Sequence, residues 1–225
     1  HLQYHELFLE IIDWIANLDV ALSNSITAKK YNYHRPEIFS GEKHSWINCK
    51  RLRHPIIEKI QHDISYVPNN VILGKEDQQS ILLYGVNACG KSSLMRSVGC
   101  AVILAQAGCF VPAEEMKLSP YSYLFTRISN NDNLFKGQSS FAVEMSELRS
   151  ILQRANGNSL VLGDELCSGT ESTSALAIVA AGVETLAKLD TSFVFATHLH
   201  PLAKLDNILA FTNIHHYHLK VHFDP

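Results

Sequence analysis

Apolar and polar positions recur with two different periods along the chain, and the period predicts the type of element. Between residues 7 and 26 the apolar side chains are spaced three and four apart, which is the stripe of an amphipathic helix. We expect this helix to end before Pro36, because a proline disfavours helical geometry at the residue before it. Trp14 lies within the helix and is expected to fill a hydrophobic core. Residues 37–73 carry short apolar groups broken by glycine, proline and asparagine, a pattern that predicts a small antiparallel β region.

From residue 81 onward, short apolar runs alternate with longer segments of helical periodicity. The expected strands are 81–84, 121–128, 159–162 and 192–196, and the expected helices are 94–107, 141–155 and 172–189. This alternation indicates an α/β fold in which helices flank a sheet.

The strand expected at 81–84 runs into a loop with the spacing G-x-x-x-x-G-K-S. The residues of this loop are Gly85, Val86, Asn87, Ala88, Cys89, Gly90, Lys91, Ser92 and Ser93. Glycines allow the backbone to curl until successive N–H groups point at one anion, and the following helix adds the positive end of its dipole. In such a P-loop, Lys91 would reach the β- and γ-phosphates of a nucleotide and the Ser92 hydroxyl would bind Mg²⁺. A chance turn is the alternative, but the flanking strand and helix patterns favour the P-loop.

A second candidate group follows the strand expected at 159–162. Asp164 stands where the strand ends and would hold Mg²⁺ through the water shell of the metal, while Glu165 could orient or deprotonate an attacking water. Taken alone, an Asp-Glu pair after an apolar run is usually a solvated turn. A P-loop upstream makes the nucleotide interpretation the stronger one.

His198 follows the strand expected at 192–196 in the same way. In an open α/β sheet, ligands bind at the carboxyl ends of the strands, so His198 is expected to face the same crevice as Lys91 and Asp164. It is a candidate sensor of the γ-phosphate, with an ordinary surface histidine as the alternative.

Composition narrows the class of protein. The 225 residues, of which 46% are hydrophobic, suit one or two globular domains, and the ends His1 and Asp-Pro suggest a piece of a longer protein. No apolar run approaches the roughly 18 to 20 residues that span a bilayer, and no secretory signal begins the chain, so we expect an intracellular protein. The net charge of −3 argues against strong nucleic-acid binding by this chain alone. Five cysteines without a C-x-x-C pair indicate neither a disulfide framework nor a zinc ribbon.

Two further features suggest weaker chemistry. His215, His216, His218 and His222 crowd the C-terminal end; on a strand, the last three would share one face and could bind zinc. A polar strand that truncation of the chain exposes explains them as well. Cys89, near the start of a helix, could be a reactive thiol or a small residue that fills the loop.

Three further stretches resemble one family in their order and spacing. They are Arg53-His54-Pro55, the segment 137–145 (Gly-Gln-Ser-Ser-Phe-Ala-Val-Glu-Met), and Asp164-Glu165-Leu166-Cys167-Ser168-Gly169-Thr170 followed by Phe195-Ala196-Thr197-His198. With the P-loop, they make residues 15–221 resemble the ATPase domain of the MutS family of DNA mismatch repair proteins. The resemblance implies a P-loop ABC-type ATPase with a mixed sheet flanked by helices, a small antiparallel β region before the P-loop and an N-terminal lever helix. It divides the chain into the end of the lever helix with its connector, 1–36, and the ATPase domain, 37–225.

The resemblance also implies an ATP–Mg²⁺ site clamped at a dimer interface. Asn87 would contact the phosphates, and Tyr66 would stack on adenine. Ser139 and Ser140 would reach the γ-phosphate bound by the opposite subunit. The implied partners are a second MutS-like subunit and mismatched DNA held by regions outside this chain, with no membrane. The remaining assignments are His54 and Pro55 to nucleotide binding and Lys91, Glu165 and His198 to catalysis.

Departures from the family pattern leave alternatives open. Val86, Ala88 and Cys89 fill variable slots of the P-loop, and Cys167-Ser168 replaces a usual Gly-Arg, which indicates a divergent branch. A nucleotide-gated dimerisation and signalling module with little hydrolysis is therefore one alternative. Another ABC-type chromosome or repair ATPase is the second, although the sequence lacks the Leu-Ser-Gly-Gly signature of such proteins.

Overall fold

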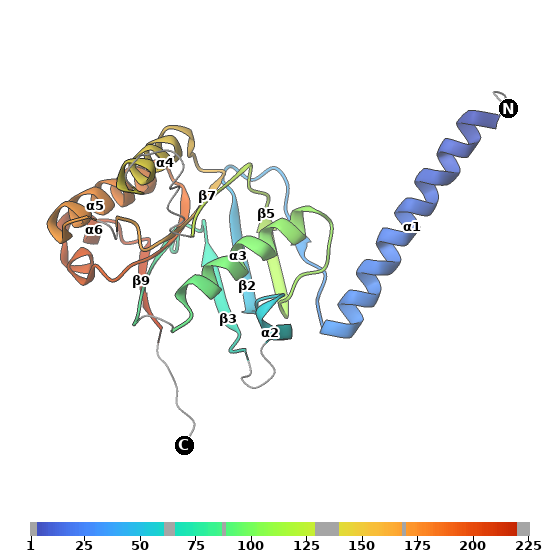
Figure 1. Cartoon of the computed structure of the whole chain (residues 1–225), viewed down its shortest axis with the longest axis horizontal. Coiled ribbons are helices and arrows are strands. Elements are labelled where there is room, and N and C mark those ends of the chain that lie inside the picture. Colours follow the sequence, from blue (N-terminus) through green and yellow to red (C-terminus); the bar gives the residue numbers. More distant parts are fainter. Residues whose placement is uncertain (1–3, 61–65, 87–88, 129–139, 168–169, 220–225) are drawn as a thin grey trace, which may run out of the picture.

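Two β-sheets and the helices around them form the body of the protein, from which one long helix extends (Figure 1). The structure is a computed structural model, and it describes residues 4–60, 66–86, 89–128, 140–167 and 170–219. Helix α1 (His5–Tyr31) is the extended helix, and both sheets follow it in the chain.

The smaller sheet has the strand order β1-β5-β2-β3. Its strands are β1 (Glu37–Ile38), β2 (Trp46–Leu52), β3 (Asn69–Leu73) and β5 (Glu115–Ser119). Strand β2 is antiparallel to β3 and β5, but β1 runs parallel to β5. The antiparallel prediction is therefore right for β2 and β3 but wrong for the whole sheet. Strand β5, from beyond the P-loop, lies between β2 and β1, and its pairing with β1 is parallel. The apolar residues 56 and 57 lie not in a strand but at the turn into the short helix α2 (Ile57–Ile60).

The larger sheet has the order β6-β7-β8-β4-β9. Its strands are β4 (Ser80–Tyr84), β6 (Tyr123–Arg127), β7 (Ser159–Asp164), β8 (Ser192–Ala196) and β9 (Ile214–His218). Every pairing described in this sheet is parallel. The expected mixed sheet around the P-loop is thus corrected: the described P-loop sheet is parallel, because helical segments return the chain between strands, and the smaller sheet is the mixed one.

Alternate residues of the central strands face two separate cores. The longer helices of the body are α3 (Lys91–Gln106), α4 (Ser140–Arg154) and α5 (Ser172–Lys188), and the short ones include η3 (His200–Lys204) and α6 (Asp206–Leu209). Ile81 and Leu83 of β4 pack in the core that contains α3 and the smaller sheet, whereas Leu82 and Tyr84 pack in the core that contains α5. The P-loop strand is buried on both faces, which explains its continuous apolar run.

Helix α1 confirms the helix predicted at 7–26, but the core prediction for Trp14 is wrong. Trp14 is 65% exposed, and Ala28 is the buried residue of this helix. Only the C-terminal end of the helix lies next to the body, and the rest extends away from it (Figure 1). The apolar stripe of the helix is therefore not covered by any element of the described chain. Among the described residues, no helix combines the length and apolar character needed to cross a membrane. The domain boundary expected after residue 36 stays a prediction.

Candidate nucleotide-binding site

Three neighbouring strands of the parallel sheet end at the same level and lead into the candidate residues. The strands lie in the order β7-β8-β4, and Ala196 is in register with both Leu83 and Asp164. The chain leaves β4 into the P-loop, β7 into the turn at Glu165, and β8 toward His198. The structure therefore brings these segments to one edge of the sheet, where open α/β folds bind ligands.

The side chain of Lys91, the first residue of α3, turns back into the P-loop. Gly90 before it has a φ of 100°, a left-handed conformation that suits glycine and lets the chain enter the helix. The Lys91 ammonium donates hydrogen bonds to the carbonyl oxygens of Gly85 at 2.7 Å and Val86 at 3.1 Å, and it lies 3.9 Å from Glu165 Oε1. The buried cation is thus held beside a helix N-terminus, the arrangement that attracts phosphate.

Asp164 ends β7 and is the candidate metal ligand. Its Oδ1 is buried and has no hydrogen-bond partner among the described residues. Burial raises the pKa of Asp164, and the Glu165 charge adds to this, while a hydrogen bond with Ser92 and the charges of Lys91 and Arg96 lower it. A buried carboxylate oxygen beside a serine hydroxyl is the hard oxygen donor set that Mg²⁺ prefers, so these residues fit the ion.

The turn after Asp164 places Glu165 beside the P-loop. Glu165 and Cys167 have φ angles of 48° and 62°, which residues other than glycine adopt infrequently. The Glu165 N–H donates to Ala196 O at 2.9 Å, and the Cys167 N–H donates to Glu144 Oε1 at 2.8 Å. Two elements, β8 and α4, therefore hold the backbone of this turn.

Tyr66, the predicted adenine platform, lies against the P-loop helix. Its hydroxyl is 3.0 Å from Ser97 Oγ, which in turn donates to Ser93 O at 2.8 Å. Burial raises the pKa of the Tyr66 phenol, the hydrogen bond with Ser97 lowers it, and the Glu58 charge raises it. The ring is anchored next to the P-loop serines, and its stacking role stays a prediction.

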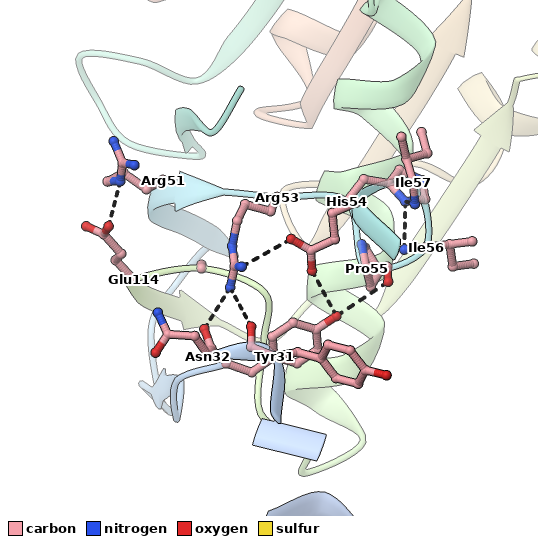
Figure 2. Close-up of polar contacts among 12 residues, drawn as sticks. Tyr31, Asn32, Arg51, Arg53, His54, Pro55, Ile56, Ile57 and Glu114 are labelled. Carbon is pink, nitrogen blue, oxygen red and sulfur yellow. Dashed lines mark hydrogen bonds and ion pairs between the residues drawn. The ribbon is translucent and has the colours of Figure 1, made fainter. Parts of the chain in front are cut away.

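The Arg-His-Pro motif is built into the junction between α1 and the body (Figure 2). His54 is buried, and its Nδ1 accepts the backbone N–H groups of residues 56–57, both at 3.2 Å. Burial, and then the Arg96 charge, lower the pKa of His54. The Pro55 carbonyl accepts a hydrogen bond from the Tyr33 hydroxyl at 3.5 Å. Nδ1 of the histidine is therefore committed to the local backbone, which leaves the opposite edge of the ring for any ligand.

The predicted residues Asn87, Ala88 and Ser139 lie outside the described part of the chain. Ser140 is the first residue of α4. The side chains of Val86 and His198 are exposed. A Cβ added to Gly85 would lie 2.6 Å from Cys89 Sγ, so the start of the P-loop has no room for a larger residue unless the thiol moves.

The described part of the histidine-rich end holds no cluster of three or more side chains placed to bind a metal. His216 instead stacks on Tyr84 of β4, with ring centroids 5.9 Å apart and an interplanar angle of 6°. His200 also stacks on this tyrosine at 5.8 Å. The zinc interpretation thus has no support in the described chain, and His222 lies outside it.

Comparison with known proteins decides the family. The family model described as MutS domain V matches residues 81–224. The chain belongs to the MutS family. It is 44% identical over 224 residues to a mitochondrial DNA mismatch repair protein mutS homolog of Sarcophyton glaucum, a match that covers 98% of this chain and 22% of that protein.

Two further MutS relatives come from a virus and a bacterium. A putative DNA mismatch repair protein mutS homolog of Acanthamoeba polyphaga mimivirus is 38% identical over 250 residues, with 96% of this chain and 22% of that protein covered. The DNA mismatch repair protein MutS of Caldicellulosiruptor bescii is 39% identical over 195 residues, with 85% and 22% covered. The chain thus corresponds to the ATPase domain of MutS proteins and spans 22% of the length of these relatives.

Sequence reasoning missed three residues that lie at this MutS site. Arg96 and Ser97 stand four positions after the P-loop serines, so the helical period places them on the same face as those serines. Glu144 lies in line with the buried Leu148 and Ile151 of α4. The signal in the sequence that could have identified Glu144 was a charged residue within an apolar stripe.

Proposed function

We propose that this MutS domain binds ATP with Mg²⁺ and hydrolyses it, as the nucleotide-driven part of a DNA mismatch repair protein. The observation that carries the proposal is the meeting of Lys91, Asp164 and Glu165 at one edge of the parallel sheet, with Lys91 Nζ 3.9 Å from Glu165 Oε1. The names of the MutS relatives, all of them mismatch repair proteins, support the biological role.

Each group has a distinct role in the proposed reaction. Lys91 binds the β- and γ-phosphates as a point charge within the P-loop. Ser92 and Asp164 would hold Mg²⁺, which would neutralise charge on the phosphate oxygens. Glu165 orients or deprotonates the attacking water, and His198 contacts the γ-phosphate from the end of β8.

A second MutS-like subunit is proposed to complete the site. Ser139 and Ser140 would cover the γ-phosphate bound by that subunit. Mismatched DNA would be held by regions outside this chain, in keeping with its net charge of −3. We also propose an intracellular location, in the cytoplasm, the nucleus, an organelle or a viral factory.

The variant Glu165→Gln tests the proposal in the full-length dimer. The amide keeps the shape of the side chain but cannot accept the proton of water. ATP–Mg²⁺ affinity should therefore change little, while single-turnover hydrolysis falls about a hundredfold or more. Glu184→Gln alters a carboxylate on α5 that pairs with Lys188, and it should leave both quantities unchanged.

Two outcomes would contradict the proposal in different ways. Equal hydrolysis rates for the wild type and Glu165→Gln would mean that Glu165 is only a turn residue. A wild-type dimer that binds ATP tightly without hydrolysing it would favour the nucleotide-gated dimerisation module.

A further inference from the structure

Glu144 is a buried carboxylate to which the reaction described above gives no role. It is 5% exposed and lies in line with the buried Leu148 and Ile151 of α4. Charged side chains are almost never buried without a partner. A peptide group is a partner of Glu144 in the described chain, since its Oε1 accepts the N–H of Cys167 at 2.8 Å.

The peptide that Glu144 holds belongs to the turn that carries Glu165. Within three residues, Glu165 and Cys167 both have positive φ angles, 48° and 62°. Such backbone persists only where the surrounding structure over-determines it. Here the Glu165 N–H donates to Ala196 O at 2.9 Å, the Leu166 side chain is buried, and the Cys167 N–H is held by Glu144. Glu144 therefore fixes the far end of the turn.

We propose that Glu144 is a positioning residue for ATP hydrolysis, which keeps Glu165 beside Lys91 by holding the backbone of Cys167. The inference rests on the proposed function, because it concerns the rate of that reaction. A hydrogen bond to an ionised carboxylate is shorter and roughly twice as strong as one between neutral groups. Burial, and then the Glu144 charge, raise the pKa of the Cys167 thiol to about 11, so the thiol beside the carboxylate stays protonated at neutral pH.

The same contact links the turn to helix α4. Because α4 begins at Ser140, one of the residues proposed to act on the opposite subunit, a displacement of this helix also moves the backbone at Cys167. Glu144 thus links the turn that carries Glu165 in the site of one subunit to helix α4, whose first residue is proposed to act in the site of the opposite subunit.

Three replacements of Glu144 in the full-length dimer separate positioning from packing. Glu144→Ala removes the acceptor, and Glu144→Asp keeps the charge but shortens its reach by one methylene. Both should lower kcat about tenfold to a hundredfold, the scale of a small misplacement of a catalytic group, with ATP–Mg²⁺ affinity changed less than about threefold. Glu144→Gln keeps an oxygen that accepts the Cys167 N–H, so it should retain kcat within about threefold.

The matched control is Glu147→Ala. Glu147 lies one turn further along α4, and its side chain is 49% exposed. It pairs with Arg127 at 3.0 Å. Its removal should leave kcat unchanged. If Glu144→Ala does not fold, the comparison of Glu144→Asp with Glu144→Gln gives the same test.

A double variant shows whether Glu144 acts through Glu165. Groups that act as one unit are not additive, so adding Glu144→Ala to Glu165→Gln should lower the residual rate by less than about threefold. A full further loss would overturn the proposal, as would an unchanged kcat in Glu144→Asp or an equal loss in Glu144→Gln. A wild-type dimer without hydrolysis would overturn the proposed function together with this inference, whereas an active wild type with unaffected Glu144 variants would overturn this inference alone.

Discussion

The junction between α1 and the ATPase body is expected to depend on Arg53. Its guanidinium donates to the carbonyl oxygens of Asn32 at 2.7 Å and Tyr31 at 3.2 Å, at the C-terminal end of α1 (Figure 2). It also donates to Glu58 Oε2 at 3.1 Å, and the other oxygen of Glu58 accepts the Tyr33 hydroxyl at 3.3 Å. The change Arg53→Ala removes the donor that joins α1 to this network.

The expected loss of stability follows from these contacts. The side chains of Arg53 and Glu58 are 22% and 13% exposed, so solvent screens their ion pair only in part. Breaking a buried pair by removing one partner costs about 3–5 kcal/mol, and partial exposure reduces this to about 2–4 kcal/mol. For a domain of this size, the loss corresponds to a fall in Tm of about 4–16 °C.

Thermal and urea unfolding of the chain measure this loss, and Arg51→Ala is the matched control. Arg51, two residues earlier, pairs with Glu114 at 2.6 Å, but both side chains are 57% exposed. Exposed pairs contribute about 0–1 kcal/mol, so the control should barely change the unfolding free energy. Arg53→Ala should also speed proteolysis between α1 and β1, because the carbonyls at the end of α1 lose their partner. Equal losses in the two variants would refute the reasoning.

Two further changes probe the nucleotide pocket. Lys91→Ala is expected to abolish tight ATP binding, since it removes the cation from the P-loop, and titration with a fluorescent ATP analogue checks this; unchanged affinity would contradict the P-loop assignment. Tyr66→Ala is expected to weaken ATP and GTP binding about fivefold, on the order of 1 kcal/mol for a stacked ring, whereas Tyr66→Phe keeps the ring and the affinity. A loss in Tyr66→Phe as well would assign the effect to the hydroxyl and its Ser97 contact.

Local periodicity predicted β4, β6, β7 and β8 of the parallel sheet because these strands are short and largely apolar. The expected strands did not include β9, whose residues are mostly histidine and tyrosine. The strand expected at 192–196 matches β8 to the residue. The P-loop helix begins at Lys91 rather than at residue 94, since its first turn is polar and the apolar period starts only at Leu94. The ends of elements depend on loop geometry and capping, which the apolar pattern does not encode.

Two features of the fold depend on contacts that the local pattern does not contain. Strand β5 was missed although Met116 and Leu118 alternate with polar residues, because its partner is the distant strand β2, where Asn48 pairs with Lys117. The prediction that Trp14 lies in a hydrophobic core was wrong for a related reason. Periodicity shows which face of a helix is apolar, but not whether another element covers that face. The contact of Glu144 with Cys167 is a third such case, since it joins segments 23 residues apart.

Two charges buried at the site, those of Lys91 and Glu144, have backbone peptide groups as hydrogen-bond partners. Lys91 donates to two backbone carbonyls, and Glu144 accepts a backbone N–H. A lysine ammonium has three protons, so one remains for a phosphate oxygen. Glu165 lies 3.9 Å from Lys91, beyond hydrogen-bond distance, and Asp164 Oδ1 has no hydrogen-bond partner among the described residues. The charges with fixed partners thus shape the loops, whereas the two carboxylates at the strand end retain the bonding capacity that a metal–phosphate ligand and its attacking water require.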